Sequence, residues 1–215
     1  MIDMSKNIRE FNIIVAGVGG QGSIMLSHII GNAAIKENYR VRVAETYGAS
    51  MRGGKVFGQI RMGTDVLSPL VSEDSADIVL ALEPLEGLRV GVKYLAKHGI
   101  AILNVRPLIP MDVNVGKAVY PDVKSIVESL SRLCQKVISI DATEIAEKTG
   151  SPRAMNIVLL GALAATERLP VSIDTLRETM TEHVPKGTED INLNALKLGY
   201  EAVQKLAQSG SIKGR

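Results

Sequence analysis

Residues 12–22 read NIIVAGVGGQG, an apolar stretch that runs directly into a cluster of glycines. The first part, residues 12–16, has the composition of a short buried strand. Gly17, Gly19 and Gly22 then satisfy the G-x-G-x-x-G pattern with an extra glycine at Gly20, and an apolar-faced helix is expected to follow as far as residue 38. A strand, a glycine turn and a helix in this order predict the opening of a Rossmann-like α/β domain.

The chain continues to alternate between strand and helix patterns after this opening. Helices are expected at residues 85–96 and 123–134, and strands at residues 41–45, 55–62, 77–82, 100–104 and 137–141. We expect the first of these strands to be buried, the second to be half-exposed and the third to be central. The alternation predicts a three-layer α/β sandwich, in which helices cover both faces of a mostly parallel sheet.

Two segments depart from this alternation. Residues 106–122 contain three prolines and two apolar alternations, which predict an irregular hairpin inserted beside the main sheet. From residue 142 onward the pattern is helical, with helices expected at residues 142–149, 156–168, 173–183 and 192–207. We therefore expect a short tail at residues 1–10, one domain with a helical C-terminal extension at 11–208, and a flexible tail at 209–215.

Composition excludes several classes of function. The net charge is only +2 and aromatic residues make up 3 % of the chain, which disfavours a nucleic-acid-binding protein. The single cysteine, Cys134, cannot form an internal disulfide and cannot supply the thiolates of an iron–sulfur cluster. The first residues lack the apolar core of a signal peptide, and the apolar stretch at 155–165 is too short to span a bilayer. These features predict a cytoplasmic protein with no membrane partner and no cluster of its own.

The glycine turn is a candidate anion-binding site. Its backbone amides and the N-terminus of the following helix would meet at one point, which favours a phosphate or a carboxylate. Glu45 ends the second expected strand about 20 residues beyond the last glycine, where a dinucleotide-binding fold places its ribose carboxylate. The alternative is that the glycines only let the first helix pack closely on the sheet. The pattern alone leaves both interpretations open.

Four stretches taken together resemble one known family. They are GVGGQG at the opening, MRGGKV after the second expected strand, SPLVSEDSADIVLALEP across the central strand, and INLNALKLGYEAV near the end. In this order they resemble the gamma, or small-subunit, type of the 2-oxoacid:ferredoxin oxidoreductases over residues 10–205. Within that family, ALEPLEGLR and RGGKV are most similar to the beta subunit of the indolepyruvate enzyme, and the gamma subunit of a pyruvate- or 2-oxoglutarate-type enzyme is the alternative. The resemblance makes a free-standing NAD-dependent dehydrogenase a weaker hypothesis.

The resemblance implies a reaction in which a 2-oxoacid and coenzyme A give an acyl-CoA, CO2 and reduced ferredoxin. That chemistry uses thiamine diphosphate, Mg²⁺ and iron–sulfur clusters. The chain contains no Gly-Asp dipeptide of a thiamine signature and only one cysteine. The resemblance therefore implies a chain without catalytic residues, inactive alone, in a hetero-oligomer whose large subunit carries these cofactors and which passes electrons to ferredoxin.

Two groups of residues are candidates for a role in such a complex. The turn formed by Gly17, Gly19, Gly20, Gln21 and Gly22 is expected to bind an anionic group such as a coenzyme A phosphate. We expect a second group of residues to face the partner subunit or to form part of the active-site wall: Glu45, Arg52, Gly53, Gly54 and Lys55. Simpler interpretations stand beside these: Gln21 satisfies backbone amides, Arg52 is a solvated turn residue, and Glu45 pairs with Arg42 or Arg52.

Overall fold

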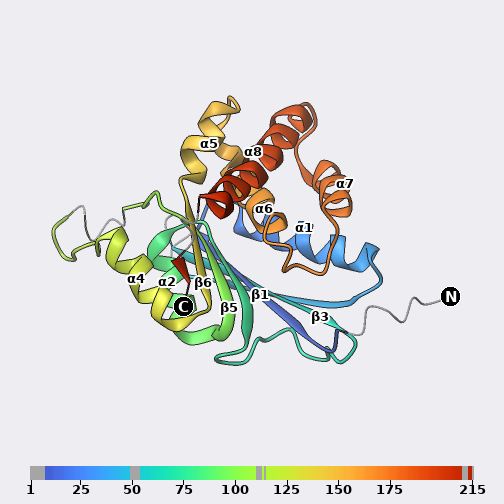
Figure 1. The fold of residues 1–215 in the computed structure, drawn as a ribbon, viewed down its shortest axis with the longest axis horizontal. Coiled ribbons are helices and arrows are strands. Elements are labelled where there is room, and N and C mark those ends of the chain that lie inside the picture. Colours follow the sequence, from blue (N-terminus) through green and yellow to red (C-terminus); the bar gives the residue numbers. More distant parts are fainter. Residues whose placement is uncertain (1–7, 49–53, 110–112, 114, 210–212, 215) are drawn as a thin grey trace.

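The computed structural model describes residues 8–48, 54–109, 113, 115–209 and 213–214. These residues form a seven-stranded sheet in the order β2-β3-β1-β4-β5-β6-β7 (Figure 1). The strands are β1 (Phe11–Val18), β2 (Arg40–Tyr47), β3 (Lys55–Gly63), β4 (Ala76–Ala81), β5 (Leu95–Asn104), β6 (Lys136–Ile140) and β7 (Lys213–Gly214). The helices are α1 (Ser23–Lys36), α2 (Pro84–Tyr94), α4 (Val123–Leu133), α5 (Ala142–Lys148), α6 (Met155–Ala164), α7 (Ile173–His183) and α8 (Glu189–Gln208), with a 3-10 turn at Pro152–Ala154.

The centre of the sheet is parallel and its margins are antiparallel. Strands β1, β4, β5 and β6 pair in parallel, so their carboxyl ends lie at one edge of the sheet. Strand β3 runs antiparallel between β1 and β2, and β7 runs antiparallel to β6. The prediction of an α/β fold with a mostly parallel sheet is confirmed in this central part.

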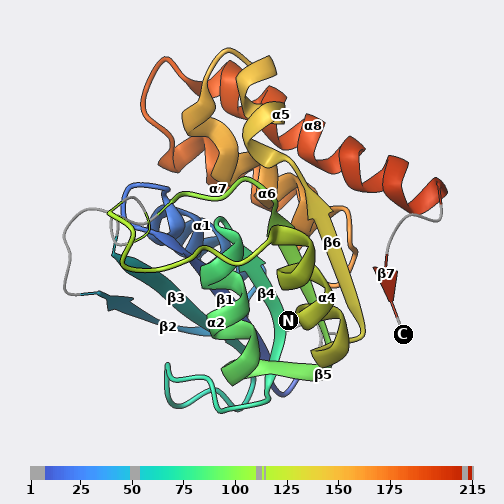
Figure 2. The same ribbon diagram turned by 90° about the vertical axis from the view of Figure 1, so that its left-hand side faces the viewer.

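Helices cover both faces of the sheet. Helices α2 and α4 pack on one face and α1 and α6 on the other, with α7 and α8 outside α1 and α6 (Figures 1 and 2). Strand β1 shows why two cores form: Ile13 and Val15 pack toward α1 and α6, and Ile14 and Ala16 pack toward α2 and α4. This follows from the two-residue period of a strand.

Three expectations about the fold need correction. The strand at 41–45 was expected to be buried, but β2 is an edge strand of half-exposed residues because β3 separates it from β1. The hairpin expected at 106–122 has no strand among its described residues, since Pro107 and Pro121 lack the N–H donor that a strand ladder requires. The strand at 55–62 was expected to be half-exposed, but most residues of β3 are buried because this strand lies between β1 and β2. In the segment at 209–215, Lys213 and Gly214 pair with β6.

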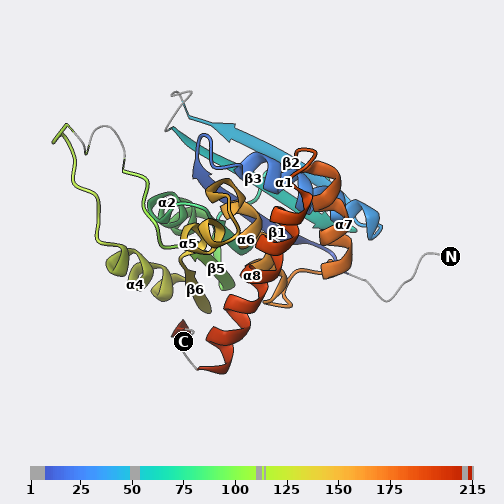
Figure 3. The ribbon, with the colours of Figure 1, turned by 90° about the horizontal axis from the view of Figure 1, so that it is seen from above.

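The C-terminal helices are joined by a close crossing of α6 and α8 (Figure 3). Helix α6 is buried from Met155 to Leu163, and Gly161 and Gly199 let the two backbones touch. A Cβ at Gly199 would lie 1.9 Å from the Val158 carbonyl oxygen, and one at Gly161 would lie 2.0 Å from that of Leu196. Within the described ranges, no helix has both the length and the apolar character needed to cross a bilayer.

Candidate functional site

The glycine turn brings the start of α1 to the carboxyl end of β1. Gly20 (φ 99°) and Gly22 (φ 82°) adopt the left-handed conformation, which costs glycine little and other residues more. Gly22 is the N-cap of α1 and has no side chain to accept a hydrogen bond from the first turn. The first N–H groups of a helix lack acceptors within it, so this end of α1 can donate to an anion.

Gln21 faces the protein rather than a ligand. Its Oε1 accepts a hydrogen bond from the Val18 N–H at 2.8 Å, and its Nε2 donates to the Leu82 carbonyl oxygen at 3.4 Å. The Leu82 carbonyl also accepts from Asn104 Nδ2 at 3.1 Å, so Gln21 and Asn104 together join the ends of β1, β4 and β5. These contacts agree with the simpler interpretation, in which the Gln21 side chain satisfies the hydrogen bonds of backbone groups.

A hollow of about 600 Å³ opens beside the turn. This volume falls within the range of small-molecule sites, about 300–1,000 Å³. Its walls come from the turn, the first residues of α1, the end of β2 and the start of β3: Gly19, Gly20, Gly22, Ser23, Ile24, Tyr47, Gly48 and Val56. Among the described residues the lining carries no charged side chain, so backbone N–H groups, the Ser23 hydroxyl and the exposed Tyr47 are the groups available to a ligand.

The sequence predicted Gly19, Gly20 and Gly22 of this hollow but missed the other lining residues: Ser23, Ile24, Tyr47, Gly48 and Val56. The first two belong to the first turn of α1. The other three join the site because β3 lies beside β1 and β2, and the Gly19 N–H donates to the Gly54 carbonyl oxygen at 2.9 Å. The Gly48 N–H donates to the carbonyl oxygen of Lys55 at 2.7 Å, which closes the paired ends of β2 and β3. The position of Tyr47-Gly48 at the end of an expected strand is the one signal that could have found them.

Glu45 does not occupy the position of a ribose ligand. In a dinucleotide-binding fold the second strand lies next to the first, but here β3 separates β2 from β1. The Glu45 carboxylate lies 2.7 Å from His28 Nε2 and accepts a hydrogen bond from the Tyr47 hydroxyl, whose pKa it raises. Of the two partners suggested for Glu45, Arg42 donates its guanidinium N–H to the Val41 carbonyl oxygen instead, and Arg52 lies outside the described residues.

The second candidate group is described only in part. Arg52 and Gly53 lie outside the described residues, so their roles remain predictions. Gly54 borders the glycine turn through its carbonyl oxygen, and the exposed Lys55 begins β3. These two residues therefore lie at the same end of the sheet as the hollow.

A buried glutamate at the end of β4 was not predicted. Glu83 is 2 % exposed and caps α2 by accepting a hydrogen bond from the Glu86 N–H at 2.9 Å. It also accepts hydrogen bonds from the Tyr120 hydroxyl and, at 3.4 Å, from the Leu108 N–H. Glu83 therefore holds both ends of the 106–122 segment against the carboxyl edge of the sheet. The Glu83-Pro84 pair, a cap followed by proline at the first helical position, was the available signal.

A family model for pyruvate ferredoxin/flavodoxin oxidoreductases matches residues 12–202. The chain belongs to this family. Its curated relatives include indolepyruvate oxidoreductase subunits from Archaeoglobus fulgidus (43 % identical, covering 89 % of this chain and 94 % of the relative) and Pyrococcus horikoshii (38 %, covering 93 % and 98 %). A 2-oxoglutarate synthase subunit from Methanocaldococcus jannaschii is 27 % identical, covering 95 % of this chain and 97 % of the relative. The predicted membership in the small-subunit type of 2-oxoacid:ferredoxin oxidoreductases is confirmed.

Solved structures share the fold of this oxidoreductase subunit. The gamma subunit of a keto/oxoacid ferredoxin oxidoreductase from Geobacter sulfurreducens superposes with a TM-score of 0.65 at 22 % identity, covering 91 % of this chain and 99 % of that one. The 2-oxoglutarate:ferredoxin oxidoreductase from Magnetococcus marinus gives a TM-score of 0.69 at 23 % identity, covering 93 % of this chain and 32 % of that one. At these identities the likeness concerns the fold alone.

The described residues of this family member do not fit a metal cluster. They contain no group of three or more histidine, cysteine, aspartate or glutamate side chains arranged to hold a metal ion. Cys134 is buried, and its thiol lies 3.3 Å from the carbonyl oxygens of Leu130 and Lys136. Burial raises the pKa of this thiol, which disfavours the thiolate that a cluster requires.

Glu86 gives the oxidoreductase subunit a predicted pH dependence of stability. Burial raises the pKa of its carboxyl group above 4.5, although the Arg89 guanidinium, to which it is hydrogen-bonded, opposes this shift. A raised pKa means that the folded state binds this proton more tightly than the unfolded state. The contribution of the protonated Glu86 to folding stability is thus fully present below pH 4.5. It is lost as the pH rises through the pKa of Glu86 in the folded state.

The substitution Glu86→Gln removes the ionisable carboxyl group, so the variant should not lose stability when the pH rises through the pKa of Glu86. The unfolding free energy of the variant relative to the parent should increase as the pH rises from about 4 to about 8. Urea denaturation of both proteins across this range measures the difference. A difference that stays constant with pH would show that Glu86 has no raised pKa.

Proposed function

We propose that the chain is the non-catalytic beta subunit of an indolepyruvate-type, or aryl pyruvate, 2-oxoacid:ferredoxin oxidoreductase. The complex would convert a 2-oxoacid and coenzyme A to an acyl-CoA, CO2 and reduced ferredoxin. The choice of the indolepyruvate type rests on sequence identity. The chain is 38–43 % identical to four indolepyruvate oxidoreductase subunits over nearly their whole length. It is only 27–29 % identical to the 2-oxoglutarate synthase and pyruvate synthase subunits. A gamma subunit of a pyruvate or 2-oxoglutarate enzyme is the alternative.

The catalytic cofactors of such a complex would belong to a larger partner subunit. Thiamine diphosphate with Mg²⁺ supplies the carbanion chemistry, and iron–sulfur clusters carry the electrons to ferredoxin. The single buried Cys134 supports this division, because its thiol cannot form a cluster site by itself. The chain would act as one part of a hetero-oligomer and be inactive on its own.

The hollow beside the glycine turn is the proposed site for an anionic group of coenzyme A. Backbone N–H groups of the turn and the positive end of the α1 dipole would face a phosphate. Gly54 and Lys55 stand at the same end of the sheet, where Lys55 would add a cation at the mouth. Coenzyme A is present in the solved Magnetococcus marinus enzyme, which contains a segment of the same fold.

A free-standing NAD-dependent dehydrogenase is the second candidate, and the geometry disfavours it. The carboxylate that would bind the ribose, Glu45, is engaged by His28 and Tyr47. The strand order differs from that of a dinucleotide-binding domain, since an antiparallel strand lies between β1 and β2. The glycine pattern alone therefore does not support an NAD site.

Calorimetric titration of the purified two-subunit complex tests the assignment of the hollow. Desulfo-coenzyme A, which cannot react, is expected to bind, while NAD titrated under the same conditions is expected to give no saturable heat. Removing the 3′-phosphate of the ligand should weaken binding if that group occupies the turn. Saturable binding of NAD without binding of the coenzyme A analogue would favour the dehydrogenase.

A further inference from the structure

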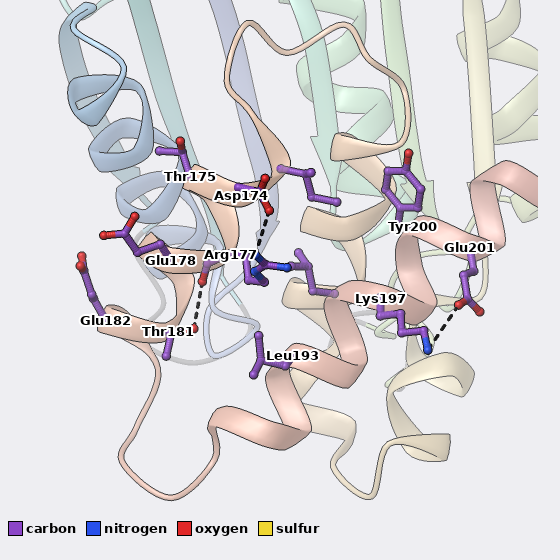
Figure 4. A pocket seen from close by; sticks show the side chains of 12 residues that line it. Asp174, Thr175, Arg177, Glu178, Thr181, Glu182, Leu193, Lys197, Tyr200 and Glu201 are labelled. Atoms are coloured by element: carbon purple, nitrogen blue, oxygen red, sulfur yellow. Dashed lines mark hydrogen bonds and ion pairs between the residues drawn. The ribbon is translucent and has the colours of Figure 1, made fainter.

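A long groove lies between the two outermost helices, α7 and α8 (Figure 4). Its volume is about 1,270 Å³. One side is formed by residues 174, 177, 178 and 181 of α7, and the other by residues 193, 196, 197 and 200 of α8. These spacings place each set on one face of its helix, so the groove runs between two helical surfaces.

The groove is held open by contacts on the inner sides of both helices. Helix α7 packs against α1, where Asn32 Nδ2 lies 2.8 Å from His183 Nε2. Helix α8 is bound to α6 by the backbone crossing at Gly199. Helices α7 and α8 thus pack mainly on two different helices, and the groove lies between them.

The groove has an apolar floor and an acidic rim. Leu193, Leu196, Tyr200 and the half-exposed Ile173 supply the floor. The rim carries four carboxylates against two cations, and Lys36 of α1 pairs with two of these carboxylates, which leaves one negative charge on a chain whose total charge is +2. The rim residues are Asp174, Glu178, Glu182 and Glu201, with Arg177 and Lys197.

Both rim cations are already paired with rim carboxylates, as Figure 4 shows. Arg177 lies 2.8 Å from Asp174, and Lys197 lies 3.8 Å from Glu201. Glu178 and Glu182 share the single Lys36 and remain more than half exposed. An incoming surface would therefore meet an excess of negative charge along α7 and apolar side chains below it.

We propose that this groove receives an amphipathic helix of the larger partner subunit. An apolar stripe on that helix would contact Leu193, Leu196 and Tyr200, and lysine or arginine side chains on its flank would face Glu178 and Glu182. Two copies of this chain are poorly suited to pair groove to groove, because both grooves carry the same negative sign. The inference rests on the proposed function, which supplies the partner subunit.

No residue that the structure describes lines both the groove and the hollow beside the glycine turn. Assembly through the groove and ligand binding in the hollow can therefore be tested with separate variants.

Thr181→Trp tests the groove by filling it. Thr181 is exposed in the groove, and its hydroxyl donates to the carbonyl oxygen four residues earlier. Ser129 on α4 is likewise exposed and makes the same contact within its own helix, so Ser129→Trp is the matched control. Thr181→Trp should raise the dissociation constant of the two-subunit complex by about tenfold or more, and Ser129→Trp should change it less than about twofold.

Glu178→Gln with Glu182→Gln tests the charge on the rim. This double variant should weaken assembly at low salt and reduce its dependence on salt concentration. Interferometry with immobilised large subunit measures both effects on the intact chains. Tight assembly of Thr181→Trp would overturn the inference, as would a self-dimer of the wild-type chain that Thr181→Trp dissociates. If the wild-type chains fail to assemble at all, the proposed function itself falls.

Discussion

Gly199→Ala is expected to lower the free energy of unfolding by about 3 kcal/mol. The added Cβ would lie 1.9 Å from the Val158 carbonyl oxygen and 2.7 Å from its carbonyl carbon. These are backbone atoms of a buried helix, so no side chain can rotate away, and α8 must shift from α6. The shift would open a gap beside Leu196 and Ala195, which are buried in the same core.

Urea denaturation of Gly199→Ala measures this loss. The control is Ala207→Ser, which adds one atom at an exposed position of the same helix and should change the free energy by less than about 0.5 kcal/mol. A Gly199→Ala protein as stable as the parent would mean that α6 and α8 do not cross at backbone contact. The groove between α7 and α8 would then lose one of the contacts that hold it open.

Ile24→Glu is expected to abolish most binding of a coenzyme A phosphate in the hollow. Ile24 lies in the first turn of α1 and lines the hollow. A carboxylate there would repel the phosphate by several kcal/mol at an effective dielectric constant of about 20, so the affinity should fall on the order of ten- to a hundredfold after screening. The loss of the half-buried isoleucine side chain lowers fold stability, and the helix dipole, which favours a negative charge in the first turn, offsets part of this loss.

Ile24→Gln is the matched control for this variant. Glutamine has nearly the same size and removes the same apolar side chain, but it carries no charge. Titration of both variants, as two-subunit complexes, with desulfo-coenzyme A separates the effect of charge from the effect of shape. Equal affinities for the two variants would show that no anion binds next to the start of α1.

The order of the strands was less predictable than the strands themselves. The glycine turn was predicted correctly because a strand, glycines and an amphipathic helix are all encoded within about 25 contiguous residues. The place of β3 between β1 and β2 depends on pairing between distant strands. Residues 41–45 read as buried because Val41 and Val43 are apolar, yet these side chains pack only on one face, against α1 near Gly31.

The same limitation explains the partial prediction of the site. The glycines were found from their pattern, whereas Tyr47 and Val56 join the hollow only through the pairing of β2 with β3. Glu45 had the spacing of a ribose ligand, but spacing along the chain does not report which strand lies next to β1. Glu83 caps helix α2. It also accepts a hydrogen bond from the hydroxyl of Tyr120, 37 residues further along the chain. That long-range contact had no signal in the sequence.

The most direct test of the account is reconstitution of activity. The chain is expressed alone and together with the larger subunit encoded beside it, and each preparation is assayed for reduction of a viologen dye that requires both an aryl pyruvate and coenzyme A. We expect activity only when the two subunits are present, and none from either subunit alone. A stable chain that ignores the larger subunit and binds NAD, or a larger subunit that is fully active without this chain, would contradict it.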